Sequence, residues 1–173
     1  RKEVERWTRR HRDMGEVKPR KCPGDISLPE AMDVVETILN LSWKGSDDED
    51  GTIGRLRRLS AAALEEDKLQ VLLKFVDDTP TSFLVSFVQD DVLFPFHITY
   101  DLNLNQIGPG QVQLSLAIQE AYEKGIKKID FGGGFSYLRK WATGTREFQE
   151  VRVVRNSIRS RLLAGAYLKR KDE

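Results

Sequence analysis

The sequence is poor in the residues that form disulfides and bind metal ions. Its 173 residues include one cysteine, Cys22, and two histidines, His11 and His97. A single cysteine excludes an internal disulfide, which favours a cytoplasmic location, and so few sulfur and imidazole ligands predict no metal site. Cys22 precedes Pro23 and has no obvious histidine partner, so we interpret it as an inert thiol.

The sequence also lacks long hydrophobic runs and a strong excess of one charge. No stretch is long and apolar enough to span a membrane. The formal net charge is +1, which gives no general reason to expect DNA or an anionic membrane as a partner. Lys and Arg are concentrated in residues 1–21 and 152–171 and acidic residues in 47–50. These segments are typical of solvated surface, although some basic groups could instead meet the phosphates of a nucleotide ligand.

What the sequence does contain is enough for one folded domain. Hydrophobic residues make up 39% and charged residues 32% of a chain whose length suits a single core. We expect one domain over 1–173, with a helical lead-in (1–66), a core sheet and crossover (67–155) and a closing helix (156–173). Arg1 opens inside a charged helical pattern, so we expect this chain to be a fragment of a longer protein.

The first third of the sequence predicts helices before and after one short strand. Residues 4–14 predict a basic helix with His11 exposed, and residues 16–21 predict a strand. Ser27 and Glu30 form a capping box that starts a helix reaching to about residue 43, and a second helix is expected over 53–66.

The middle third predicts an antiparallel meander of three strands. Apolar residues alternate in 69–75, 83–87 and 92–100, with polar turns at 77–80 and 89–91. Pro95 interrupts the third strand, and because proline cannot donate a ladder hydrogen bond, we expect a bulge or break there.

The last third predicts a parallel crossover after the meander. A loop over 101–109 leads into a helix that ends near Gly125, followed by a strand at 127–131, a short helix at 135–142, a strand at 148–155 and a helix at 157–169. Such a crossover is right-handed and gives a mixed α/β sheet with helices on both faces. Gly108-Pro109-Gly110 stands at a helix start, where backbone N–H groups and the helix dipole favour an anion such as pyrophosphate.

Three motifs in this region resemble one branch of the GNAT acetyltransferases, the cellulose-biosynthesis-like (CelD-like) branch. They are Gly108-Pro109-Gly110 before a helix, the segment 128–134 (KIDFGGG), and the segment 135–141 (FSYLRKW). The resemblance covers roughly residues 69–155. The branch differs from this sequence at two positions, since Asn105 stands where Gln or Arg is usual and Leu138 where Lys is usual.

The resemblance implies an acyltransferase that moves an acetyl or other acyl group from acyl-CoA to an amine or hydroxyl of a small-molecule or saccharide acceptor. It further implies a companion GNAT-like half in the full-length protein. Such an enzyme must bind the pyrophosphate, accept a proton from the nucleophile and supply one to the leaving thiolate. The candidate donors to the phosphates are the backbone N–H groups of Ile107, Gly108, Gly110 and Gln111, together with the side chains of Arg139 and Lys140.

The resemblance places Tyr137 where many GNAT enzymes have the tyrosine that protonates the thiolate, with packing between helix and sheet as the alternative. Asp130, His97 and Asp101 are candidate bases, against a turn-stabilising role for Asp130 and an ordinary strand histidine at His97. Trp43 and Trp141 are candidates for acceptor binding, although large aromatic side chains are more often core residues.

Two other functions remain open at the level of sequence. One is a tRNA-dependent aminoacyl transfer domain of the peptidoglycan-bridge type, which the basic ends fit in part and the net charge does not support. The other is a non-catalytic GNAT-like binding or scaffold domain, which the departures at Asn105 and Leu138 would fit.

Overall fold

The computed structural model describes residues 2–43, 51–133, 136–145 and 147. Two units of the chain, residues 1–134 and 135–173, are described separately. The strand expected at 148–155 and the helix expected at 157–169 lie outside the described residues, as does the acidic segment 47–50.

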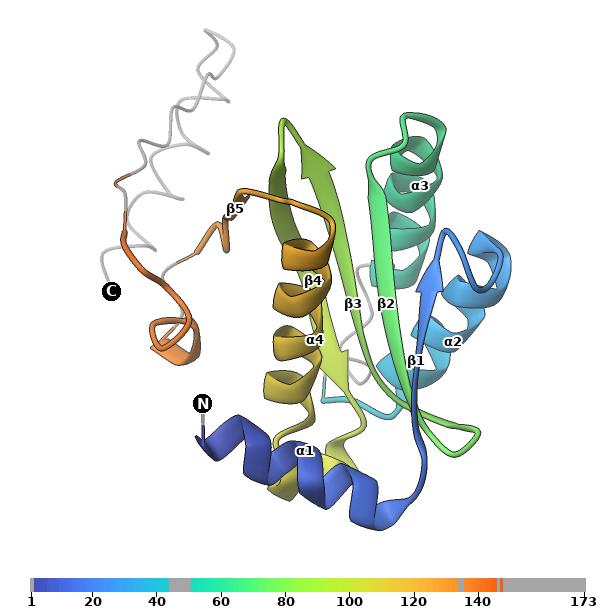
Figure 1. Ribbon diagram of the computed structural model, residues 1–173. Helices are drawn as coiled ribbons and strands as arrows, with labels where there is room; N and C mark the ends of the chain where they lie inside the picture. Colours follow the sequence, from blue (N-terminus) through green and yellow to red (C-terminus); the bar gives the residue numbers. More distant parts are fainter. Residues whose placement is uncertain (1, 44–50, 134–135, 146, 148–173) are drawn as a thin grey trace, which may run out of the picture. The chain divides into compact units, whose positions relative to one another are not determined.

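The first unit is built on a five-stranded mixed sheet in the order β1-β2-β3-β4-β5 (Figure 1). The pairs β1–β2, β2–β3 and β3–β4 are antiparallel, and β5 runs parallel to β4. The expected meander and parallel crossover are therefore both present. The strands are β1 (Val17–Cys22), β2 (Leu69–Val76), β3 (Thr79–Gln89), β4 (Val92–Tyr100) and β5 (Lys128–Ile129).

Aspartates form the tight turns of the meander. Asp90 and Asp91 connect β3 to β4 with φ angles of 50° and 58°, a left-handed conformation that short polar side chains tolerate. Two consecutive residues with positive φ match the twist of the flanking strands, as in type I′ hairpin turns. Asp77 has φ 54° between β2 and β3 and also accepts the N–H of Glu16 at 2.8 Å, which ties the start of β1 to this turn.

Helices cover both faces of the sheet (Figure 1). On one face, α2 and α3 pack on a core that includes Val71, Leu73 and Phe83. On the other, α4 packs on Leu72 and Leu84. The helical elements are α1 (Lys2–Met14), α2 (Leu28–Asn40), α3 (Thr52–Glu65), η2 (Leu102–Ile107), α4 (Pro109–Glu123) and, in the second unit, η3 (Ser136–Leu138).

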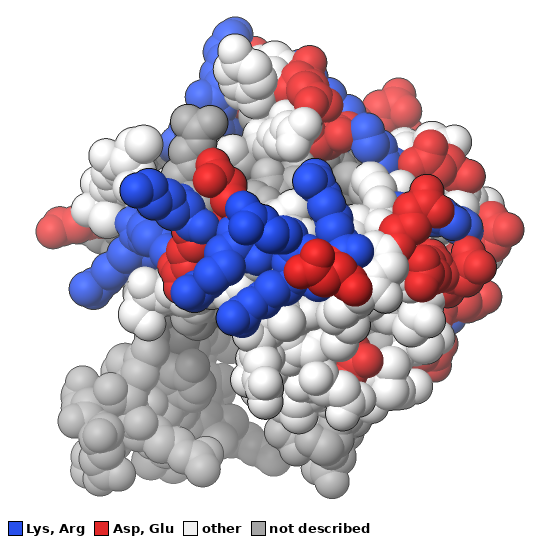
Figure 2. All heavy atoms as spheres, turned by 60° about the horizontal axis from the view of Figure 1, so that its bottom comes forward, with Lys and Arg blue, Asp and Glu red and all other residues white. Residues whose placement is uncertain are grey.

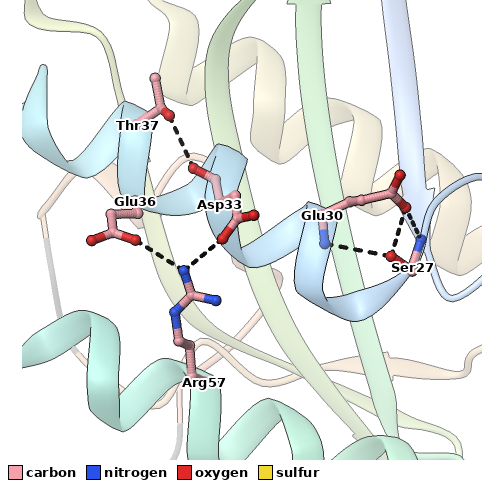
Figure 3. Close-up of polar contacts among 6 residues, drawn as sticks. All are labelled: Ser27, Glu30, Asp33, Glu36, Thr37 and Arg57. Carbon is pink, nitrogen blue, oxygen red and sulfur yellow. Dashed lines mark hydrogen bonds and ion pairs between the residues drawn. The ribbon is translucent and has the colours of Figure 1, made fainter.

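Polar contacts fix the start of α2 and its position against α3 (Figure 3). The predicted capping box is present: the Ser27 hydroxyl accepts the N–H of Glu30, and the Glu30 carboxylate accepts the N–H of Ser27. The guanidinium of Arg57 on α3 contacts the carboxylates of Asp33 at 2.7 Å and Glu36 at 2.9 Å, so one cation bridges two acids a turn apart on α2.

His11 is fully buried, which corrects the expectation that it is exposed. Its Nδ1 lies 2.7 Å from Nζ of Lys74, which is also fully buried, on the face of β2 that α1 covers. Burial, then the nearby Lys74 charge, lowers the pKa of His11 to about 4, and burial lowers the pKa of Lys74 to about 7. Neutral His11 therefore accepts a hydrogen bond from Lys74 and fastens α1 to the sheet.

We predict that Lys74→Met removes a rise in stability at alkaline pH. The unfolded chain keeps the lysine proton up to about pH 10.5, whereas the folded protein loses it near pH 7. Between these values the unfolded state binds more protons, so the free energy of unfolding increases with pH, by up to about 1.4 kcal/mol per pH unit. Urea unfolding between pH 7 and 9.5 should show this slope in the wild type and in an exposed-lysine control, Lys2→Met. An unchanged slope in Lys74→Met would refute it.

Candidate functional site

Strand β4 carries the irregularity that the sequence predicts at Pro95. Val85 of β3 pairs with His97, and the next residue, Ser86, pairs with Pro95, so Phe96 is an extra residue in β4. This is a β-bulge, which bends a strand and changes the alternation of its side chains.

The bulge places His97 on the face of the sheet that carries Phe83 and Phe87, here called the aromatic face. Without it, His97 and Phe96 would point to opposite faces; instead, Phe96 contacts Phe87 with ring centroids 5.2 Å apart, and His97 stacks on Phe83 at 5.7 Å. Both partners belong to the face that α2 and α3 cover. Phe96 is 46% exposed, so this part of the face is not filled by core packing.

Strand β5 accompanies β4 over a short distance. The parallel ladder consists of Val92 with Lys128 and Leu93 with Ile129, and the last backbone bond runs from the Asp130 N–H to the Leu93 carbonyl at 2.9 Å. Beyond Leu93, β4 continues to Tyr100 with no strand paired on that edge in the described part of the chain. The described pairing of β4 with β5 therefore ends at Leu93, just before the bulge.

The turn before α4 is more fully bonded than the sequence suggests. Gly108 has φ 62° and caps both η2 and α4. Its N–H donates to the Asn105 carbonyl at 3.2 Å, and the N–H of Gln111 donates to the Gly108 carbonyl at 3.0 Å. Two of the four expected phosphate donors differ from Gly108 and Gln111. Ile107 lies within η2. The N–H of Gly110, in the first turn of α4, has no acceptor among the described residues.

Helix α1 lies against this turn. A Cβ on Gly108 would come within 2.7 Å of the Trp7 ring, and Arg10 donates to the carbonyl of Gln106 at 3.4 Å. Asn105 accepts the hydroxyl of Tyr100 at 2.9 Å, which ties η2 to the end of β4. This contact of α1 was not predicted, although Trp7 and His11, four residues apart, mark a buried face on an otherwise charged helix.

Two of the candidate bases are engaged in local structure. Asp101 caps η2, accepting the backbone and side-chain N–H groups of Asn103, both at 2.9 Å. Asp130 accepts the N–H of Gly132 at 3.0 Å, the turn-stabilising role considered as its alternative, and lies 3.6 Å from the amine of Lys128. His97 is the candidate base that the fold brings to a partly open face.

The remaining candidates lie at the end of α2 and in the second unit. Trp43 follows α2 and is 59% exposed. In the second unit, the expected helix at 135–142 is reduced to η3 and the turn after it, with Tyr137 in η3 and Arg139, Lys140 and Trp141 following. Burial raises the pKa of Tyr137, which keeps its hydroxyl protonated at neutral pH.

No group of three or more His, Cys, Asp or Glu residues that could hold a metal ion occurs among the described residues. No described helix combines the length and apolar character needed to cross a membrane.

Comparison with protein families matches residues 1–140 to the family described as "Acetyltransferase (GNAT) domain". No curated protein matches the sequence. Among solved structures, aminoglycoside acetyltransferase AAC(6')-Iy, in complex with a bisubstrate analogue, is 15% identical with a TM-score of 0.52 and covers 83% of this chain and 99% of its own.

An aminoglycoside acetyltransferase (HMB0005) from an uncultured soil metagenomic sample has a TM-score of 0.53 at 14% identity, over 82% of this chain and 99% of its own. The ribosomal-protein-alanine N-acetyltransferase of Brucella melitensis biovar Abortus 2308 has a TM-score of 0.51 at 14% identity, over 82% of this chain and 100% of its own. At these identities the likeness establishes a shared fold.

We predict that Gly108→Ala destabilises the protein more than Gly125→Ala. Both glycines have positive φ, 62° and 70°. Alanine at either position must adopt this left-handed backbone conformation, which costs about 1 kcal/mol. Nothing lies within 4 Å of a Cβ at Gly125, whereas a Cβ at Gly108 meets Trp7. Chemical denaturation should show an extra loss of about 1–3 kcal/mol for Gly108→Ala. Equal losses would show that α1 does not press on this turn.

Proposed function

Because the chain belongs to the acetyltransferase (GNAT) domain family, we propose that it transfers an acetyl or other acyl group from acyl-CoA to an amine of a small-molecule or saccharide acceptor. We assign it to the CelD-like branch on its three sequence motifs. An amine acceptor is favoured because solved structures with the same fold include aminoglycoside and ribosomal-protein-alanine N-acetyltransferases.

The observation that carries the proposal is the separation of β4 from β5 after Leu93. In this proposal the thioester lies along an extended backbone edge, which β4 offers beyond the ladder and next to the bulge. Part of the aromatic face opens at the same place, since Phe94 is 37% and Phe96 46% exposed. The donor lies along this edge, and the acceptor enters from the side of Phe96 and His97.

The start of α4 binds the pyrophosphate in this proposal. The N–H of Gly110 and the positive end of the α4 dipole face that position. The local bonds of Gly108 and Gln111 span three residues and are 3.2 and 3.0 Å long, so these N–H groups can be shared with a phosphate oxygen. Glycine at 110 leaves room for the Tyr100 ring, since an added Cβ would lie 3.2 Å from that ring, which is a tight contact.

The reaction is attack of the amine nitrogen on the thioester carbonyl carbon. A carbon–nitrogen bond forms, the carbon–sulfur bond breaks, the amine loses one proton and the thiolate gains one. His97 accepts the proton of the amine, because it is the candidate base on the partly open face whereas Asp101 and Asp130 bond to nearby backbone groups. Tyr137 donates to the thiolate, and Arg139, Lys140, Trp43 and Trp141 assist binding, as the family resemblance implies.

We predict that His97→Gln lowers kcat about 10²–10⁴-fold, the usual contribution of a general base. Glutamine keeps a polar side chain of similar size and removes the titrating group. The kcat–pH profile should lose its acidic limb while acetyl-CoA binding, measured by calorimetry, is unchanged. A His97→Gln variant with wild-type kcat would show that His97 is not the base. The same kcat measurement on Tyr137→Phe tests whether Tyr137 donates the proton to the thiolate.

We predict that Gly110→Trp abolishes acetyl-CoA binding in calorimetric titration, because a large side chain at 110 must displace the Tyr100 ring and so disturbs the turn that binds the pyrophosphate. Tyr122→Trp is the control, since Tyr122 is 84% exposed near the far end of α4. Unfolding midpoints check that both variants fold. Undiminished binding by Gly110→Trp would show that the pyrophosphate does not bind at the start of α4. A wild-type protein that binds neither acetyl-CoA nor free CoA would favour a non-catalytic binding domain.

A further inference from the structure

The outward face of α1 carries a stripe of arginines. Arg6, Arg9 and Arg10 are three and four residues apart, a spacing that places side chains on the same side of a helix, and all three are exposed. The guanidinium groups of Arg6 and Arg9 have no hydrogen bond or ion pair with any described residue. Figure 2 shows Lys and Arg side chains crowded on the face that α1 forms.

Three contacts hold this arginine stripe beside the turn before α4. Trp7 packs on Gly108, Arg10 donates to the Gln106 carbonyl, and the buried His11–Lys74 hydrogen bond fixes the next turn of the helix. The stripe is therefore part of the surface around the start of α4. Packing contacts of α1 therefore determine where the stripe lies.

The charge of the stripe is not neutralised by its own helix. Helix α1 has five Lys and Arg residues against Glu3, Glu5 and Asp13. Asp13, four residues after Arg9, forms no ion pair with it. Unpaired guanidinium groups repel one another, and an anion of high charge density relieves that repulsion.

We propose that Arg6, Arg9 and Arg10 of α1 bind the ribose 3′-phosphate of the acyl-CoA donor. The assignment rests on the proposed function, because it requires the pyrophosphate to lie at the start of α4. From there the adenosine end of the donor extends over the adjoining surface, and its terminal phosphate is a dianion. Guanidinium groups bind phosphate through paired N–H donors, which suits a stripe in which Arg6 and Arg9 have no ion pair among the described residues.

The test compares CoA with dephospho-CoA, which keeps the pyrophosphate and lacks the 3′-phosphate. Calorimetry gives the dissociation constants of both ligands for the wild type, for Arg6→Ala/Arg9→Ala, and for the control Arg55→Ala/Arg58→Ala. The control removes the same charge from exposed positions on α3, which packs on the opposite face of the sheet. Alanine suits an exposed helical position, so both double variants should fold.

The expected result is that the wild type and the control bind CoA roughly tenfold more tightly than dephospho-CoA, and that this preference disappears in Arg6→Ala/Arg9→Ala. Affinity for dephospho-CoA should stay within about twofold across all three proteins. A preference that survives in Arg6→Ala/Arg9→Ala would overturn the assignment and leave acyl-CoA use intact. A wild type that binds neither ligand would overturn the proposed function as well.

Discussion

The loss of regular pairing along β4 is the constraint on which the proposed site depends. Pro95 cannot donate to a ladder, and Phe96 directly after it is the extra residue of a bulge. The bulge moves His97 to the aromatic face, and β5 leaves β4 two pairs into their ladder, at Leu93. A regular strand would put His97 on the α4 face. The irregular strand thus turns His97 toward the aromatic face, close to the part of the β4 edge that has no paired strand among the described residues.

A second constraint acts through polar side chains on the face toward α4 and α1, two of them buried and one, Tyr100, partly exposed. Lys74, Ser82 and Tyr100 lie side by side on β2, β3 and β4. Each finds a polar partner from another element: His11 of α1 for Lys74, Gln113 of α4 for Ser82 and Asn105 of η2 for Tyr100. Because an unpartnered buried polar group is costly, these pairs specify which helix lies where. They hold α1, α4 and η2 around a single turn, at Gly108.

The sheet could be predicted from the sequence because its signals are local. Alternating apolar residues, paired aspartates and Pro95 specify strands, turns and a bulge without knowledge of distant contacts. The burial of His11 could not be predicted, because it depends on Lys74, which is 63 residues away in the sequence. The same limit applies to the turn before α4. The glycines identified the turn, but its bonds to Asn105 and its cover by Trp7 are set by tertiary packing.

These long-range contacts explain how the departure at Asn105 fits the proposed function. Asn105 is shorter than the Gln or Arg typical of the CelD-like branch, and its side chain binds Tyr100 and does not extend toward a phosphate. Position 105 therefore adds no side-chain donor to the backbone N–H groups of the turn. Arg10 lies at the same turn through its bond to Gln106, and Arg6 and Arg9 continue the positive charge along α1. In the proposed function, the positive charge that the loop lacks at position 105 comes from the arginines of the helix that packs against it.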